Sequence, residues 1–147
     1  MYGFLLLLHV LGASVWVGGH LVLALGVLPG ALRERDVAGL LAFESRYEKV
    51  GMPALAVQVV TGLWLAWRFL PEPMQWFDAS TPIARLILAK LILLGLTVVI
   101  ALHARLRVIP VLDGRRLPAM AGHVVAVTIL SVLFVVVGLS ARAGWLA

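Results

Sequence analysis

The chain has 147 residues, of which 63% are hydrophobic and only 13% are charged. A soluble domain of this length needs far more polar surface to cover its core, so the composition predicts an integral membrane protein. The absence of cysteine excludes disulfides, iron–sulfur clusters and thiolate metal sites. The net charge of +5 does not indicate nucleic-acid binding, because the basic residues lie at the ends of apolar runs, where they act as topology signals.

Four apolar runs are each long enough for the roughly 20 residues that a bilayer core requires. They cover about residues 3–28, 51–70, 83–106 and 119–141. The first run lacks a basic leading region and a convincing cleavage site, so we interpret it as a retained span and not as a signal peptide. Thr81 followed by Pro82 is typical of a helix start and marks the third span. The predicted fold is all-α: one transmembrane domain over residues 1–147, folded as an integral membrane four-helix bundle.

Three connections separate the spans. The first, residues 29–50, is rich in charge and is expected to be partly helical. The second, residues 71–82, carries Trp76 and Phe77, aromatic residues typical of a membrane interface, and the third contains an Asp113-Gly114 turn. The first and third connections and the adjoining helix ends hold most of the basic residues: Arg33, Arg35, Arg46, Lys49, Arg105, Arg107, Arg115 and Arg116. The positive-inside rule therefore predicts a multi-pass protein of the bacterial inner membrane, with these connections cytoplasmic and both termini periplasmic.

The ionisable groups inside the spans are few, and the four histidines of the chain are all among them. Such groups cost roughly 2.5–3.5 kcal/mol each on insertion scales, so they tend to face the bundle interior and to be functional. Depth divides them into two sets. His9 and Lys90 lie near the outer face, and a second set near the cytoplasmic ends comprises His20, His103 and His123, with Met52 and Met120 in the same layer.

The side chains of each layer are suited to binding a cofactor or a metal ion. His9 and His20 are eleven residues apart and share one helix face with Trp16, an arrangement that bundle cytochromes use to hold haems at two depths. Imidazole is a common haem and transition-metal ligand, so the outer layer could hold a haem b. The inner layer could hold a second haem, or copper if the two thioethers take part. The alternative is that each histidine only hydrogen-bonds across helices.

Other features narrow the function further. Gly12, Gly19 and Gly26 recur on the first helix, which indicates a packing seam or, alternatively, room for a flat cofactor. No aspartate or glutamate lies inside a span, so a carboxylate proton relay is excluded. The serines have no plausible base beside them, and hydrolytic chemistry is not expected. The sequence identifies no catalytic residue.

Three stretches resemble a known family. "LHVLGASVWVGGHL", with His9, Trp16 and Gly19, is similar to the first helix of the bacterial CopD-type copper-resistance membrane proteins and of HemJ, the membrane protoporphyrinogen oxidase. "FESRYEKVGMPALAVQVVTGLWLA" resembles the second helix of both groups, and "AKLILLGLTVVIALHARLRVIP" resembles their third. The resemblance covers roughly residues 4–110.

The two groups imply different cofactors. The likeness to HemJ implies a haem b held by the first-helix histidine and the third-helix lysine, which are His9 and Lys90 here. The fourth span lacks the arginine and asparagine-glutamate-proline pattern of HemJ, so protoporphyrinogen oxidation itself is not implied. The likeness to CopD implies copper uptake across the inner membrane.

The favoured functional prediction is a haem b protein, with one or two haems, for electron transfer or membrane redox chemistry with a redox partner or quinone. If it is an enzyme, it is a membrane oxidoreductase. The first alternative is a CopD-like copper transporter that uses His20, His103 and His123, with Met52 and Met120. The second is a cofactor-free accessory subunit of a larger membrane complex. A homo-oligomer is compatible with each of these predictions.

Overall fold

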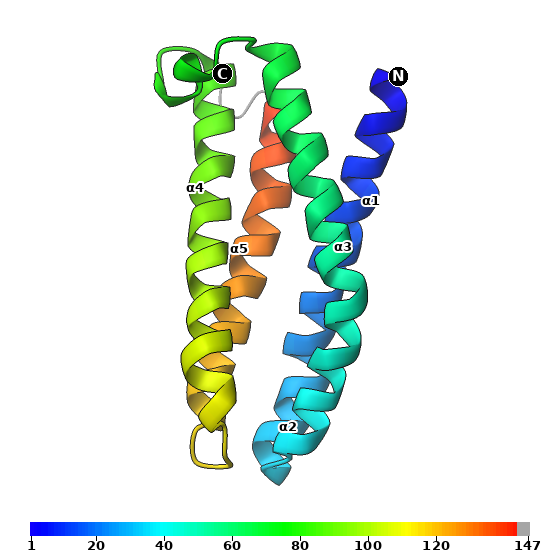
Figure 1. The fold of residues 1–147 in the computed structure, drawn as a ribbon, viewed down its shortest axis with the longest axis vertical. Coiled ribbons are helices and arrows are strands. Elements are labelled where there is room, and N and C mark those ends of the chain that lie inside the picture. Colours follow the sequence, from blue (N-terminus) through cyan, green and yellow to red (C-terminus); the bar gives the residue numbers. More distant parts are fainter. Residues whose placement is uncertain (144–147) are drawn as a thin grey trace.

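The computed structural model describes residues 1–143 of the chain, with side chains up to residue 140. In this part the chain forms four long helical rods (Figure 1). The first rod consists of α1 (Tyr2–Leu21), a π-helical segment η1 (Val22–Val27) and α2 (Leu28–Glu34). The second is α3 (Val37–Phe69), and a short 3₁₀ turn η2 (Pro73–Phe77) follows it. The third joins α4 (Pro82–His103) to a π-helical segment η3 (Ala104–Val108) and a 3₁₀ turn η4 (Ile109–Val111). The fourth is α5 (Leu117–Ala143).

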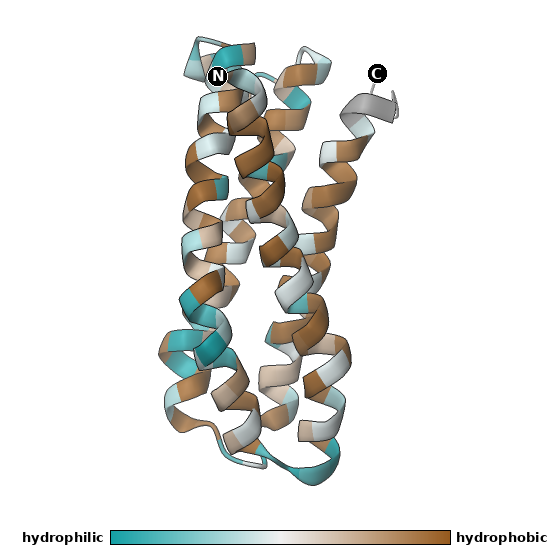
Figure 2. Ribbon diagram, turned by 90° about the vertical axis from the view of Figure 1, so that its right-hand side faces the viewer, coloured by the Kyte–Doolittle hydropathy of each residue, from teal (hydrophilic) through white to brown (hydrophobic). Residues whose placement is uncertain are grey.

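All four rods are long and apolar enough to cross a membrane. Figure 2 shows hydrophobic residues along most of their length, with hydrophilic residues mainly toward the ends. Many large apolar side chains, such as Leu25, Val60 and Val99, are more than half exposed in the isolated chain, which is the surface that lipid tails cover. The prediction of an all-α membrane bundle is confirmed, and the protein is a multi-pass membrane protein.

The rods pack as two pairs. α1 packs along α3, α4 packs along α5, and the two pairs join mainly where α1 meets α5 (Figure 1). α3 and α4 have little direct contact, and Arg105 of η3 forms an ion pair with Glu48 of α3 across their seam. The N-terminal end of the first rod and the C-terminal end of the fourth rod lie at the same end of the bundle (Figure 1). We call the opposite end, with Arg33, Arg35, Arg115 and Arg116, the basic end.

The first connection is far more helical than its composition suggests. Only Arg35 and Asp36 lie between α2 and α3, where a connection over residues 29–50 was expected. Arg35 takes a left-handed conformation (φ 55°) that ends α2, and the Asp36 carboxylate then caps α3 by accepting from the Gly39 amide at 2.8 Å.

This early start makes α3 about 50 Å long at 1.5 Å per residue. Residues 50–69 are enough to cross a hydrocarbon core of about 30 Å. The preceding part of α3, which carries Glu44, Arg46, Glu48 and Lys49, therefore extends to the level of the lipid headgroups.

The other two connections are closed by side-chain hydrogen bonds. Thr81 accepts from the Ala84 amide at 3.1 Å and so caps α4, which confirms the predicted start. The Trp76 indole donates to the Leu70 carbonyl at 2.9 Å and ties η2 back to the end of α3. The Asp113 carboxylate accepts from the amides of Arg115 and Arg116 at 3.0 and 2.9 Å, which confirms the turn at Asp113-Gly114.

The glycines of α1 allow α3 to approach closely. A Cβ on Gly12 would lie 2.8 Å from the Ala54 carbonyl oxygen, and a Cβ on Gly19 would overlap the Tyr47 ring. Gly26 has only Val22 of its own helix nearby, at 4.0 Å, so it takes no part in this seam. The first two glycines therefore set the distance between α1 and α3.

Gly19→Ala should destabilise the protein by about 1–3 kcal/mol, because the added methyl group forces the Tyr47 ring out of its place. Thermal or denaturant unfolding in detergent would measure this change. The neighbouring Gly18 is the matched control, since no atom lies within 4 Å of a Cβ placed there. Gly18→Ala should be neutral or stabilising by up to about 1 kcal/mol through reduced backbone entropy. Equal effects of the two substitutions would contradict the close approach at Gly19.

Candidate functional site

His9 is held against α3 by its Nδ1 atom. This atom lies 3.0 Å from the Gln58 carbonyl oxygen and 3.0 Å from Thr61 Oγ1. A carbonyl oxygen can only accept, so Nδ1 carries the proton and Nε2 keeps a free lone pair. The ring edge rests on Gly62, where a Cβ would lie 3.0 Å from His9 Cε1. Beside it, Gln58 Oε1 is buried without a hydrogen-bond partner among the described residues.

Lys90 reaches the same level from α4. Its Nζ lies on Gly138 of α5, where a Cβ would be 3.5 Å away. His9 of α1 and Lys90 of α4 thus both lie in the half of the bundle opposite the basic end.

His20 lies in a different setting, between Trp16 and Tyr47. It is buried, with 8% of its surface exposed, and its ring centre is 4.5 Å from that of Trp16. Its Nδ1 atom donates to the Trp16 carbonyl at 2.9 Å, and the Tyr47 hydroxyl donates to the same oxygen at 2.9 Å. The Tyr47 ring fits into the space that Gly19 and Gly51 leave free. These contacts make His20, Trp16 and Tyr47 one aromatic cluster on the α1–α3 seam.

The backbone after His20 widens into the π-helical segment η1, which loosens the hydrogen bonding at the α–π junction. The Thr128 hydroxyl of α5 donates to the His20 carbonyl at 3.3 Å as well as to the Val124 carbonyl of its own helix at 2.7 Å. The second π-helical segment, η3, begins directly after His103, whereas η1 begins two residues after His20. Irregular segments of this kind recur at functional sites.

His103 of α4 and His123 of α5 form a direct pair. His103 Nδ1 lies 2.8 Å from His123 Nε2, and the two rings are nearly parallel, with 6° between their planes and 5.0 Å between their centres. His123 Nδ1 donates to the Ala119 carbonyl at 2.8 Å. His123 Nε2 is therefore the acceptor, His103 Nδ1 is the donor, and His103 Nε2 has a free lone pair. His103 is exposed and His123 is half-buried, so the pair is accessible from outside the bundle.

The inner layer of the sequence analysis is thus divided between the two helix pairs. His103 and His123 meet on α4 and α5, whereas His20 belongs to the aromatic cluster on α1 and α3. Met120 is buried in the apolar cluster with Leu23, Leu117 and Val124, and Met52 is 51% exposed on α3. In the described part of the chain, no three histidine, aspartate or glutamate side chains gather closely enough to hold one metal ion.

Tyr47 and Gln58 are the two site residues that sequence reasoning did not select. Gln58 supplies the backbone carbonyl for His9 and a buried amide oxygen beside it. Tyr47 was placed in a charged connection. The signal for it was Gly51, four residues later on the same helix face, which leaves room for an aromatic ring.

The fold and the intramembrane histidines define a multi-pass membrane protein with imidazole ligands available near both ends of the bundle. A comparison with known protein families matches residues 41–143 to the family described as CopD: Copper resistance protein D. The chain belongs to this family. No protein of curated function and no solved structure matches the chain. The matched region contains Tyr47, Lys90 and the His103–His123 pair, but not the α1 residues His9, Trp16 and His20. The related prediction of a likeness to HemJ stays a prediction.

The shared hydrogen bond makes a clear prediction for the protonation of the pair. In ¹⁵N-histidine NMR spectra of the metal-free protein at neutral pH, His123 and His103 should both show the Nδ1-protonated tautomer. In the His123→Ala variant, His103 should shift toward the Nε2-protonated tautomer that free histidine prefers, because its acceptor is gone. His9→Ala is the control and should leave both signals unchanged. An Nε2-protonated His123 in the unmodified protein would contradict the arrangement.

Proposed function

We propose that this protein binds copper in the membrane and takes part in moving it across, with the His103–His123 pair as the binding site. Membership of the copper resistance protein D family supports copper as the substrate. The contact between His103 and His123 is the observation that carries the choice of residues, since it joins two imidazoles from facing helices within the matched region. Imidazole nitrogen is a suitable ligand for copper ions.

The geometry of the pair suits one shared ion. Metal–imidazole bonds are about 2 Å long, so two nitrogens that share an ion at a tetrahedral angle lie roughly 3.3 Å apart. The present separation of 2.8 Å between His103 Nδ1 and His123 Nε2 reaches that value with small side-chain rotations. The ion takes the place of the shared proton, which moves to His103 Nε2. The Ala119 carbonyl keeps His123 in the tautomer that presents Nε2 to the ion.

The pair lies in the half of the bundle toward the basic end, which the positive-inside rule places in the cytoplasm of a bacterial inner membrane. The Arg105–Glu48 ion pair, two residues beyond His103, marks the headgroup level nearby. His103 is exposed on the outside of the bundle and is the last residue of α4, toward the basic end. His9, near the opposite end, is the first imidazole on the periplasmic side.

Purified protein that is loaded with copper and then desalted should retain about one ion per chain. His103→Ala and His123→Ala should each lower the retained copper at least tenfold, since one imidazole alone holds the ion weakly. Metal analysis of the desalted protein would measure this. His9→Ala is the matched control, because it removes a histidine outside the pair, and it should leave the copper content unchanged. Copper retention that survives loss of His103 or His123 would disprove this assignment.

A second candidate function is a haem b between His9 and Lys90, as the resemblance to HemJ implies. It is favoured by the tautomer of His9, whose Nδ1 is held by the Gln58 carbonyl so that Nε2 is free to act as an axial ligand. Lys90 lies in the same half of the bundle, on α4 of the other helix pair. A haem held there would supply one-electron redox chemistry.

An optical spectrum of the protein purified from its native membrane decides between the two functions. If copper is the substrate and haem is absent, the oxidised and dithionite-reduced spectra should show no Soret or α band. If a haem b is bound, both bands should appear and His9→Ala should abolish or shift them, whereas His103→Ala should not. Haem bands that persist in the His9 variant would exclude His9 as the ligand.

A further inference from the structure

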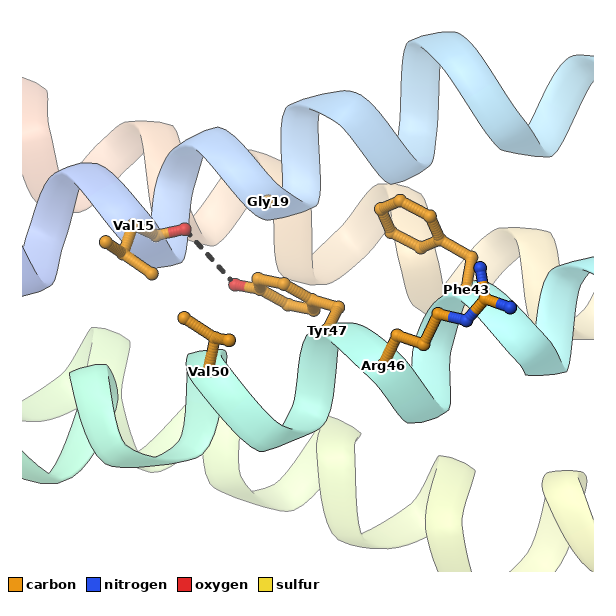
Figure 3. Close-up of a pocket in the computed structure, with 6 residues that line it drawn as sticks. All are labelled: Val15, Gly19, Phe43, Arg46, Tyr47 and Val50. Carbon is orange, nitrogen blue, oxygen red and sulfur yellow. Dashed lines mark hydrogen bonds between the residues drawn. The ribbon is translucent and has the colours of Figure 1, made fainter.

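A shallow groove runs along the outer side of the α1–α3 seam, and Tyr47 of the aromatic cluster forms part of its wall (Figure 3). Its lining residues are Val15 and Gly19 from α1, and Phe43, Arg46, Tyr47 and Val50 from α3. Most of this surface is apolar and the groove is wide open to the outside. The Tyr47 hydroxyl turns inward to the backbone of α1, so the ring presents only its apolar edge to the groove.

Arg46 supplies the charged part of the groove. Figure 3 shows its side chain running along α3 toward Phe43, away from Val15 and Val50. Arg46 forms no ion pair within the described residues, where the ion pairs join Glu48 to Arg105 and Glu34 to Arg33. Lys49 follows one turn later on α3 and is also exposed and unpaired within the described residues. An unmatched positive charge therefore stands at one end of an apolar groove.

The apolar walls and the positive charge of the groove correspond to two different depths in the bilayer. Residues 50–69 of α3 are long enough to cross the hydrocarbon core, and Arg46 lies one turn before them, toward the basic end. The apolar walls thus lie at acyl-chain depth and the guanidinium lies at headgroup depth. An amphiphile that binds here must have its anionic group toward the basic end and its hydrocarbon toward the bilayer centre.

We propose that this groove is a binding site for one anionic membrane phospholipid. Its phosphate accepts hydrogen bonds from the Arg46 guanidinium, with Lys49 adding positive charge, and one acyl chain lies against Val15, Gly19 and Val50. Arginine binds phosphate oxygens in a bidentate manner, and basic residues at a membrane surface attract anionic lipids. The lipid covers the α1–α3 seam, which holds His20, and it is independent of the copper site on α4 and α5.

Binding of phosphatidylglycerol to the delipidated protein, followed by native mass spectrometry over a range of lipid concentrations, tests the proposal. The unmodified protein should bind one phosphatidylglycerol more tightly than phosphatidylcholine. Arg46→Ala should weaken phosphatidylglycerol binding about tenfold. Val15→Trp should weaken binding of the lipid to a similar extent, because the indole fills the groove while Arg46 stays in place.

Two control variants distinguish binding in the groove from non-specific electrostatic attraction of the lipid to the basic end. Arg107→Ala removes one exposed positive charge at the same end of the bundle, and Val10→Trp adds an indole to an exposed position of α1 outside the groove. Both should bind phosphatidylglycerol as the unmodified protein does. If Arg107→Ala weakens binding as much as Arg46→Ala, or if Val15→Trp has no effect, the lipid is held by net charge alone and the proposal is wrong.

Discussion

The approach of α3 to the glycine face of α1 determines where the polar groups of the bundle lie. In a bilayer, apolar side chains gain nothing by leaving lipid for protein, so helices associate where backbones can come close. Gly12 and Gly19 provide this contact, and the Tyr47 ring occupies the space over Gly19. With α3 at this distance, the Gln58 carbonyl meets His9. A bulkier residue at Gly12 or Gly19 would push α3 away from α1 and so disrupt both the packing of Tyr47 and the hydrogen bond between His9 and Gln58.

The second constraint is that a polar group inside the membrane needs a partner. Backbone carbonyls meet this need for His9, His20 and His123, each of which donates from Nδ1 to a main-chain oxygen. The cost of burying an imidazole is thereby reduced on one side of the ring, and Nε2 keeps its lone pair on the other, where that of His123 accepts from His103. Structural and functional roles of these histidines are therefore compatible. The same hydrogen bond that anchors the side chain also presents a ligand atom.

Sequence reasoning was most successful where a single residue or a long pattern is decisive. Hydropathy predicted the four membrane helices, Thr81 the start of α4, and Asp113 the turn before α5. The helix over residues 37–50 was underestimated, because its charges resemble those of a loop although Asp36 caps it. Depth along the chain predicted the level of each histidine but not its direction around the helix. His20 and His103 therefore shared one predicted layer, yet the first faces Tyr47 and the second faces His123.

The central claim is that copper is bound by imidazole nitrogen from His103 and His123. X-ray absorption spectroscopy of the copper-loaded protein tests it most directly, because it identifies the ligand atoms without relying on activity. Copper at the pair would show an inner shell of nitrogen at about 2 Å, with the outer scattering that imidazole rings produce, and this shell would be lost in His123→Ala. A shell dominated by sulfur at about 2.3 Å would instead place the ion at the methionines and contradict the claim.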